Sequence, residues 1–341
     1  MKKLLLIFMM AFILCGCGGA EEIGREDDRL LKIYSDCAGV RQDRTAYLEK
    51  LGQMGFCAGD KSGDFDMVNT DKLEGFFRGE AESAEFIMLC HDGGFEYITL
   101  TADRIKSSRV AEAAGEARIT WQTDYELAHM EYTDKGWLIM ERIMPDNPRG
   151  GNHDGWVEPT LIYRIKPMDE ALRQACKKYI EPIGYGTNGF FMVDWDGENM
   201  ENISFSGLFP AAYSIYYGRD LIYYESPYPI DESATRAWVA ADEFENIMLP
   251  LFDITKDELR SLALFDGEKY EVSTVRTMDE KWYDVFPEVT GITENADGTL
   301  TLTVDALSQS LKTDRAFSHT VTLRDEGERV VYLENNFEPG K

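Results

Sequence analysis

Histidine and cysteine are scarce in this sequence of 341 residues, with four histidines and six cysteines. None of them forms an H-E-x-x-H or C-x-x-C motif, the spacings that are typical of zinc sites. We therefore predict neither a bound metal nor a cofactor. Six cysteines in a chain of this length also exclude a small domain that is held together mainly by disulfides.

Basic residues are few as well: the sequence has 35 Lys and Arg against 62 Asp and Glu, and a formal net charge of −27. Such an acidic surface repels phosphate backbones, so nucleic acid is not expected as a partner. The sequence also lacks the G-x-S-x-G motif and the known signatures of cysteine nucleophiles. These absences disfavour an enzyme without excluding one, because folding can bring two carboxylates together from distant positions.

Long apolar runs are limited to the start of the chain. The basic start MKK precedes an apolar run at 4–14, which is too short to span a bilayer but fits a secretory signal. The sequence LCGC follows at 14–17 and resembles the lipobox Leu-x-Gly-Cys of bacterial lipoproteins. This resemblance implies that residues 1–16 are a signal peptide and that Cys17 becomes the lipidated N-terminus.

A diacylglycerol on Cys17 would supply two acyl chains, which suffice for stable anchoring in a membrane. We therefore expect the protein on the outer face of the cytoplasmic membrane of a Gram-positive bacterium. Residues 17–29 are polar and predict a flexible tether. Four cysteines then remain, either paired in disulfides or present as buried thiols: Cys37, Cys57, Cys90 and Cys176.

Hydrophobic residues make up 44% of the whole sequence, and helical and strand patterns alternate along the chain after the tether. A helical apolar stripe at 30–55 precedes strand patterns at 85–103 and 117–143, which are joined by turns such as Asp92-Gly93-Gly94. The order recurs later, with helical spacing at 241–252 and hairpins beyond it. We predict an α+β fold of two units, each with helices followed by an antiparallel β-meander. This order resembles cystatin-like or NTF2-like half-barrels.

The predicted organisation has three parts after the tether. They are an N-terminal α+β domain at 30–165, an aromatic-rich middle segment at 166–229 and a C-terminal α+β domain at 230–341. The whole resembles uncharacterised Gram-positive surface lipoproteins, most clearly in ADEFENIMLPLFDIT and from GTLTLTVDA to VVYLENNF. That resemblance implies no activity. The C-terminal part is similar in pattern to small secreted inhibitors of cell-wall endopeptidases.

The segment NHDGW at 152–156 is the most enzyme-like stretch. His153 next to Asp154 could take part in acid–base chemistry. Adjacent side chains usually point apart, however, so a catalytic base there would need a partner from elsewhere in the fold. His153 and Asp154 are therefore the candidate residues of an alternative hypothesis, an envelope hydrolase that acts on glycan or peptide.

Six tyrosines lie between residues 213 and 228. Together with Trp195 they could form an aromatic platform for a glycan or a peptide, although such residues also fill interfaces. The candidate ligand-binding residues are Trp195, Tyr216 and Tyr223. The hypothesis that we favour is a lipid-anchored extracytoplasmic binding protein whose partner is a cell-wall glycan or a protein. The alternatives are the hydrolase and an inhibitor of wall peptidases.

Two further motifs predict turns instead of binding sites. The sequence at 184–189 matches G-x-G-x-x-G, but a strand pattern follows where a phosphate-binding loop needs a helix. The alternating acidic residues at 60–66 and 194–198 resemble the start of a calcium-binding EF-hand loop, but neither stretch completes such a loop. Phe65 stands where an EF-hand loop needs glycine, and Phe205 stands where the second loop needs a bidentate glutamate.

Overall fold

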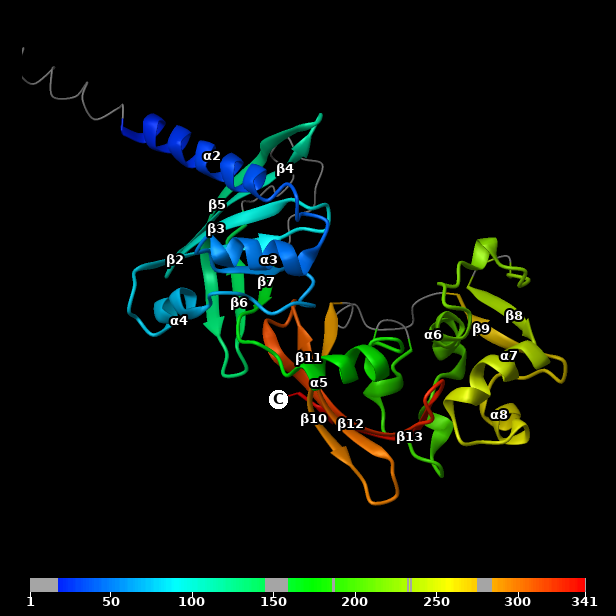
Figure 1. Ribbon diagram of the computed structural model, residues 1–341. Helices are drawn as coiled ribbons and strands as arrows, with labels where there is room; N and C mark the ends of the chain where they lie inside the picture. The colour runs from blue at the N-terminus through cyan, green and yellow to red at the C-terminus, as the bar shows by residue number, and fades with distance from the viewer. Residues whose placement is uncertain are drawn as a thin grey trace, which may run out of the picture. The chain divides into compact units, whose positions relative to one another are not determined.

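The computed structural model forms two compact units, Met1–Pro167 (unit 1) and Met168–Lys341 (unit 2) (Figure 1). It describes residues 18–144, 159–185, 188–231, 233, 235–274 and 284–340, with side chains from residue 26 onward. Both units combine helices with largely antiparallel sheets, which confirms the predicted α+β class. Among the described helices, none is long and apolar enough to cross a membrane.

Unit 1 has three helices and a seven-stranded sheet in its described part. The helices are α2 (Gly18–Asp36), α3 (Arg44–Gln53) and α4 (Asp71–Phe77). The strands are β1 (Ala58–Asp60), β2 (Ser83–Leu89), β3 (Phe95–Thr101), β4 (Arg104–Ala113), β5 (Glu116–Tyr132), β6 (Trp137–Arg142) and β7 (Thr160–Arg164). They lie in the sheet in the order of the sequence.

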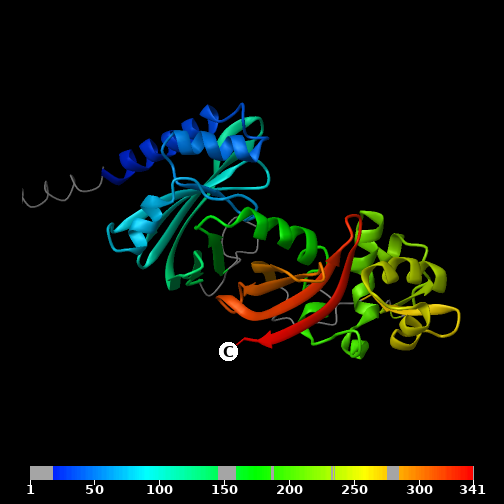
Figure 2. The same cartoon turned by 60° about the horizontal axis from the view of Figure 1, so that its bottom comes forward.

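The meander from β2 to β7 is antiparallel as predicted, but β1 is parallel to β2, so the sheet is mixed. A parallel neighbour requires a crossover connection, and the chain through α4 provides it. The register shifts between Arg109 and Val110 and between Leu127 and His129. Such bulges bend strands, which fits the curled, half-barrel shape of the sheet (Figure 2).

The sheet of unit 1 is covered on both faces. Successive side chains of a strand point to opposite faces. Ile87 and Leu89 of β2 belong to a buried cluster with residues of α2 and α3, whereas Phe86 and Met88 belong to a cluster with residues of α4. Consequently α2 and α3 cover one face, and α4 covers the other beside β2.

The first helix is longer than the sequence indicated. Its apolar stripe, Leu30, Ile33 and Tyr34, is buried as expected. The helix, however, begins at Gly18, within the segment predicted as a flexible tether. This segment contains several Glu and Arg residues, which favour helix even without an apolar stripe. After a turn, α3 begins where the Asp43 carboxylate accepts a hydrogen bond from the amide of Ala46 at 3.0 Å.

Unit 2 has four α-helices, shorter helical turns and two sheets in its described part. The helices are α5 (Glu170–Ala175), α6 (Phe205–Tyr217), α7 (Ala241–Met248) and α8 (Lys256–Leu262), and a π-helical turn, η1 (Cys176–Ile180), continues α5. The 3₁₀ turns are η2 (Phe190–Met192), η3 (Met200–Asn202), η4 (Tyr223–Glu225) and η5 (Leu249–Leu251). The strands are β8 (Arg236–Ala240), β9 (Lys269–Ser273), β10 (Val285–Glu294), β11 (Leu300–Ser308), β12 (Thr313–Asp325) and β13 (Val330–Pro339).

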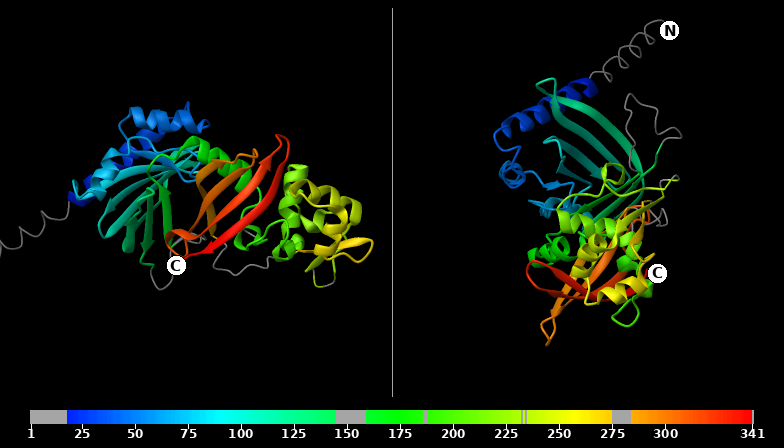
Figure 3. Two further views of the ribbon diagram at one scale, coloured as in Figure 1. Left: turned by 90° about the horizontal axis from the view of Figure 1, so that it is seen from below. Right: turned by 90° about the vertical axis from the view of Figure 1, so that its right-hand side faces the viewer.

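The C-terminal strands β10 to β13 form the predicted antiparallel meander, seen in orange and red in Figure 3. Strand β9 does not join it, but pairs with β8 in a two-stranded sheet of its own. The segment after Gly189 was predicted as a strand and instead begins with the 3₁₀ turn η2. The reason is burial: Phe190 and Phe191 both enter the core, and such an all-apolar run does not distinguish a strand from a helical turn.

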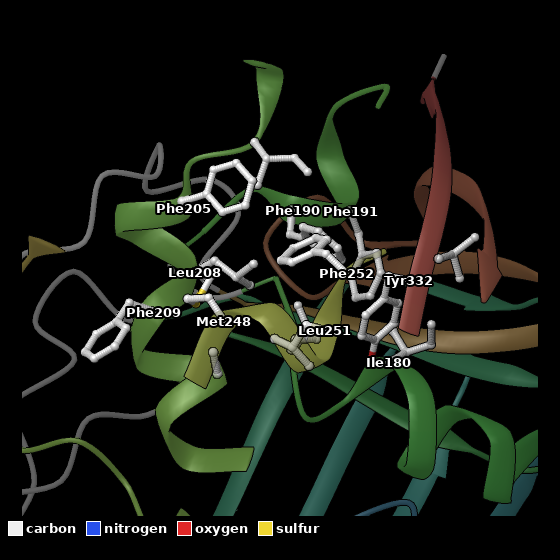
Figure 4. Close-up of a cluster of buried hydrophobic side chains, with 14 of the residues drawn as sticks. Ile180, Phe190, Phe191, Phe205, Leu208, Phe209, Met248, Leu251, Phe252 and Tyr332 are labelled. Carbon is white, nitrogen blue, oxygen red and sulfur yellow. The ribbon is translucent and has the colours of Figure 1, made fainter. Parts of the chain in front are cut away.

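One buried cluster joins the predicted middle segment to the C-terminal part (Figure 4). The ring of Phe190 lies 4.7 Å from that of Trp195, 5.9 Å from Phe252 and 5.5 Å from Tyr332, measured between centroids. Aromatic pairs at these distances add to the stability that burial provides. Residues 168–229 therefore pack in the same unit as the residues that follow them.

Candidate ligand-binding surface

Three of the residues singled out from the sequence lie outside the described part of the chain: Cys17, His153 and Asp154. Lipidation at Cys17 and a catalytic role for the His153–Asp154 pair therefore stay predictions. Two residues of the glycine motif, at 186 and 187, are outside it as well.

Trp195 lies in the core of unit 2, with 2% of its surface exposed. Its indole nitrogen donates a hydrogen bond to the carbonyl of Phe190 at 2.9 Å. Its backbone exchanges two hydrogen bonds with Asn335 of β13, at 3.0 and 2.8 Å. The structure thus places Trp195 among core residues and not on a platform that a ligand could reach.

The two tyrosines named from the sequence differ in exposure. Tyr223 is half-buried, and its hydroxyl donates to the carbonyl of Ser273 at 3.1 Å. Burial raises the pKa of Tyr223 well above its ordinary value, so this hydroxyl stays protonated. Tyr216, in contrast, is 52% exposed at the end of α6. Of the three candidates, Tyr216 is the one that faces solvent.

Tyr216 belongs to a short stretch of the chain that is rich in exposed apolar residues, which we call the aromatic surface. It comprises five large apolar side chains within ten residues: Ile215, Tyr216, Tyr217, Ile222 and Tyr224. Tyr224 is the most exposed of them, at 84%. A large exposed apolar patch is uncommon on soluble proteins and often marks an interaction site, so this density of exposed side chains makes the stretch a candidate.

The local sequence explains why this patch forms at the end of α6. Ser204 caps the start of the helix, where its hydroxyl accepts a hydrogen bond from the amide of Gly207. The buried residues of α6 extend to Tyr213, so the last turn of the helix projects beyond the core. Gly218 then ends the helix in the left-handed conformation, with φ of 65°, and the chain continues on the surface to Tyr224.

Hydrogen bonds hold part of the aromatic surface in place. One carboxylate oxygen of Glu243, on α7, accepts from the hydroxyls of Tyr228 at 2.7 Å and Tyr217 at 3.3 Å. Burial and the nearby Glu243 carboxylate raise the pKa of both tyrosines, so both hydroxyls remain donors at neutral pH. The ring of Tyr217 is therefore oriented before any ligand arrives.

Ring contacts extend this arrangement to the neighbouring residues. The centroid of Tyr217 lies 4.5 Å from that of Tyr213 and 4.9 Å from that of Tyr216, with the latter pair edge to face. The Arg219 guanidinium lies 5.9 Å from the centroid of Tyr217 and donates to the hydroxyl of Tyr213 at 3.2 Å. The rings of Tyr216 and Tyr217 are thus part of a connected network.

The sequence indicated the region of this surface but not its composition. The density of tyrosines pointed to residues 213–228, and the candidate Tyr216 is exposed there, while its role in binding stays a prediction. The other four exposed residues, Ile215, Tyr217, Ile222 and Tyr224, were not among the named candidates, while Trp195 was included although it is buried. Which aromatic residues face solvent depends on where α6 leaves the core, and no local pattern encodes that point.

The cysteines of the folded part offer no reactive thiol. Cys37, Cys57, Cys90 and Cys176 are all free and buried, so the disulfide alternative does not apply to them. Burial raises the pKa of all four, and those of Cys57 and Cys176 reach about 12. These thiols are protonated at neutral pH and behave as core residues.

His319 is also a core residue. Its ring stacks on Phe191, and its two nitrogens lie 2.8 Å from the hydroxyl of Tyr185 and 2.8 Å from the side-chain oxygen of Asn335. Burial lowers its pKa to about 4, so the imidazole is neutral. Within the described ranges, moreover, no group of three or more His, Cys, Asp or Glu side chains is arranged to hold a metal ion.

The fold and this surface define an α+β protein of two units with an exposed aromatic patch on the second. The chain belongs to DUF6070, a family of unknown function whose sequence profile matches residues 28–341. No curated protein and no solved structure matches the chain. The family match spans most of unit 1 and all of unit 2.

Proposed function

We propose that the protein is a lipid-anchored extracytoplasmic binding protein of the bacterial cell envelope, which contacts its partner through the aromatic surface of unit 2. The observation that carries this proposal is the exposure of five large apolar side chains within ten residues, three of them tyrosines. The lipobox at residues 14–17 supports the location, because it predicts a diacylglycerol on Cys17.

The composition of the surface favours a protein as the partner. Its exposed side chains are isoleucine and tyrosine, Arg219 and Asp220 lie within the same stretch, and Glu243 and Arg219 contact Tyr217. An apolar, tyrosine-rich centre with a charged rim is typical of protein interfaces, where a few aromatic residues supply most of the affinity. A glycan is the other outcome to test, since tyrosine rings also stack on sugars.

The experiment introduces a photo-crosslinking amino acid at position 224 of the full-length protein in its native host. We expect one discrete crosslinked protein, which disappears when Tyr216 and Tyr217 are changed to serine. The matched control carries the same amino acid at Leu264, which is exposed elsewhere on unit 2. Identical crosslinks from both positions would contradict a specific site. Crosslinking to wall glycan alone would reassign the surface to carbohydrate.

A further inference from the structure

Strand β2 of unit 1 has an edge that its neighbour covers only in part. On one side, β3 pairs with all of β2, from Ser83 to Leu89. On the other side, β1 pairs only with residues 87–89. No strand in the described part of the chain pairs with residues 83–86 on that side. The first half of β2 is therefore an open sheet edge.

The open edge presents backbone hydrogen-bonding groups. On the covered half, the amide of Ile87 donates to the carbonyl of Cys57 at 2.9 Å, and the carbonyl of Leu89 accepts from the amide of Lys61 at 3.2 Å. Successive residues of a strand direct their amide and carbonyl groups to alternate neighbours. Ser83 and Glu85 consequently direct theirs to the same side as Ile87, where β1 no longer runs.

The edge is open because the chain before β1 turns away from it. Gly55 adopts a positive φ of 86°, a conformation that favours glycine. The amide of Phe56 then donates to the carbonyl of Leu51 at 3.1 Å, which keeps this segment against the end of α3. A strand that continued β1 backwards would need Phe56 opposite Glu85 and Gly55 opposite Ala84, and the turn prevents that pairing.

A groove of about 870 Å³ lies along this edge. Met54 and Phe56 line it beside the end of α3, Lys72 and Gly75 line it from α4, and residues 83–85 of β2 contribute the open edge (Figure 1 shows α4 and β2). A Cβ atom at Gly75 would lie 3.0 Å from a carboxylate oxygen of Glu80. The absence of a side chain at Gly75 therefore lets the Glu80 side chain lie against α4 in the wall of the groove.

The charges of the groove are not equally available. Arg78 pairs with Glu80 at 2.8 Å, and Arg29 lies 3.8 Å from Glu85. Lys72 is exposed and forms no ion pair with any residue that the structure describes. Among the basic residues of the groove, Lys72 is thus the one left to bind an acidic group.

We propose that this groove binds an extended peptide segment of a partner protein, which adds to β2 as a new strand. Alternating amide and carbonyl groups at strand spacing complement a polypeptide backbone, and side chains of an added strand would point alternately to the two walls. Apolar side chains fit against Phe56, and acidic side chains fit against Lys72. The proposal does not rest on the aromatic surface, which belongs to unit 2.

The test uses the full-length protein in detergent and a fluorescent, acetylated Val-Glu-Val-Glu-Val-Glu peptide. We expect saturable binding by fluorescence anisotropy and slower hydrogen exchange at the amides of Ser83 and Glu85. Two control peptides carry N-methyl groups on alternate amides, one on the valines and one on the glutamates. Only the set that faces β2 should lose affinity, by about tenfold or more, because it loses the backbone hydrogen bonds.

Two variants locate the binding site. Gly75→Leu should abolish binding by filling the groove, and Lys72→Glu should weaken binding of the acidic peptide severalfold. The matched control is Lys106→Glu, which reverses an exposed charge on β4, outside the groove. Thermal unfolding checks that each variant is folded. Folded Gly75→Leu that binds as tightly as the native chain would overturn the proposal.

Two further outcomes would also overturn it. The first is a titration that shows no saturable binding up to about 1 mM peptide, because a dissociation constant above this concentration is too weak for a specific site. The second is a dimer, measured by light scattering, that is lost in Gly75→Leu, because this result would assign the edge to a second copy of the chain. Neither outcome affects the proposal for the aromatic surface.

Discussion

Glu245 shows how a single buried charge constrains unit 2. Its side chain is fully buried in the middle of α7, and its carboxylate accepts hydrogen bonds from Arg260 at 2.7 Å and from the hydroxyl of Tyr270 at 3.1 Å. Lys256 lies 3.1 Å away. Burial alone would raise the pKa of Glu245, but these three partners together lower it below its ordinary value. The carboxylate therefore joins α7, α8 and β9.

We expect Glu245→Ala to lower the free energy of unfolding of unit 2 by about 3 kcal/mol. The change removes one member of a buried network and leaves the hydroxyl of Tyr270 without its acceptor. Urea-induced unfolding, followed by hydrogen exchange in α7 and α8, measures the effect. The matched control is Glu268→Ala, an exposed carboxylate in the same region, which should change stability by less than about 0.5 kcal/mol. Equal effects of the two changes would refute this account.

His319 predicts a pH dependence of stability in unit 2. Its pKa is about 4 in the folded chain, below the ordinary value of 6.5, because burial disfavours the charged ring. Between these two values the unfolded chain binds a proton that the folded chain does not. The contribution of His319 to stability is therefore complete above pH 6.5 and decreases as the pH falls toward 4.

In His319→Phe, we expect unit 2 to lose less stability than the native protein when the pH is lowered from 6.5 to 4. The variant should be less stable than the native protein at pH 7, since Tyr185 and Asn335 lose a hydrogen-bond partner. Urea unfolding, followed by hydrogen exchange in β12, measures both the stability at pH 7 and its loss between pH 6.5 and pH 4. His129→Gln, on β5 of unit 1, is the control and should leave the slope of stability against pH, measured in β12, unchanged. A slope in His319→Phe equal to that of the native chain would contradict the assignment.

Among the elements, the helices and strands that could be predicted are those with strong local patterns. The buried stripe of α2, the meanders and the start of α8 at Thr255 follow from periodicity, turn residues and the T-x-x-E capping motif. The three-residue strand β1 is too short to carry a pattern. The pairing of β9 with β8 joins residues about 30 positions apart across α7 and α8, and it is decided by tertiary packing.

Part of the candidate surface could likewise be predicted from local sequence, and part of it depends on tertiary contacts. Tyr216 was identified because tyrosines cluster around it, but the burial of Trp195 and the half-burial of Tyr223 depend on contacts with Asn335 and Ser273. The groove beside β2 was not foreseen at all. It exists because a turn at Gly55 ends the pairing of β1, and edge pairing is a property of the sheet that short sequence windows do not encode.

The cap of α8 gives a test at the scale of one element. The hydroxyl of Thr255 accepts from the amide of Glu258, and a carboxylate oxygen of Glu258 accepts from the amide of Thr255 at 2.7 Å. We expect Thr255→Ala to destabilise unit 2 by about 1 kcal/mol, while Thr255→Ser should have a much smaller effect. Thermal unfolding compares the two variants. Equal destabilisation by both would show that the methyl group of Thr255, and not its hydroxyl, is important.

At the scale of the whole molecule, the proposed anchor predicts where the protein is found. In Cys17→Ala, the thiol that would carry the diacylglycerol is absent, so the protein should move from the membrane fraction to the soluble fraction. Metabolic labelling with a fatty acid should be lost at the same time. Cys15→Ala is the matched control and should keep both membrane association and label. Membrane association that survives in Cys17→Ala would disprove the lipobox interpretation.

Helix α2 has a mechanical consequence for a protein that is anchored in this way. It begins at Gly18, one residue after Cys17, and Leu30, twelve residues further along the helix, is buried in the core of unit 1. Twelve residues of α-helix span about 18 Å. A disordered segment of the same length could fold back or extend and would let unit 1 sample many heights above the lipid surface. A continuous helix acts as a stiff post, so partners within reach of unit 1 would have to be found in a layer of nearly constant depth.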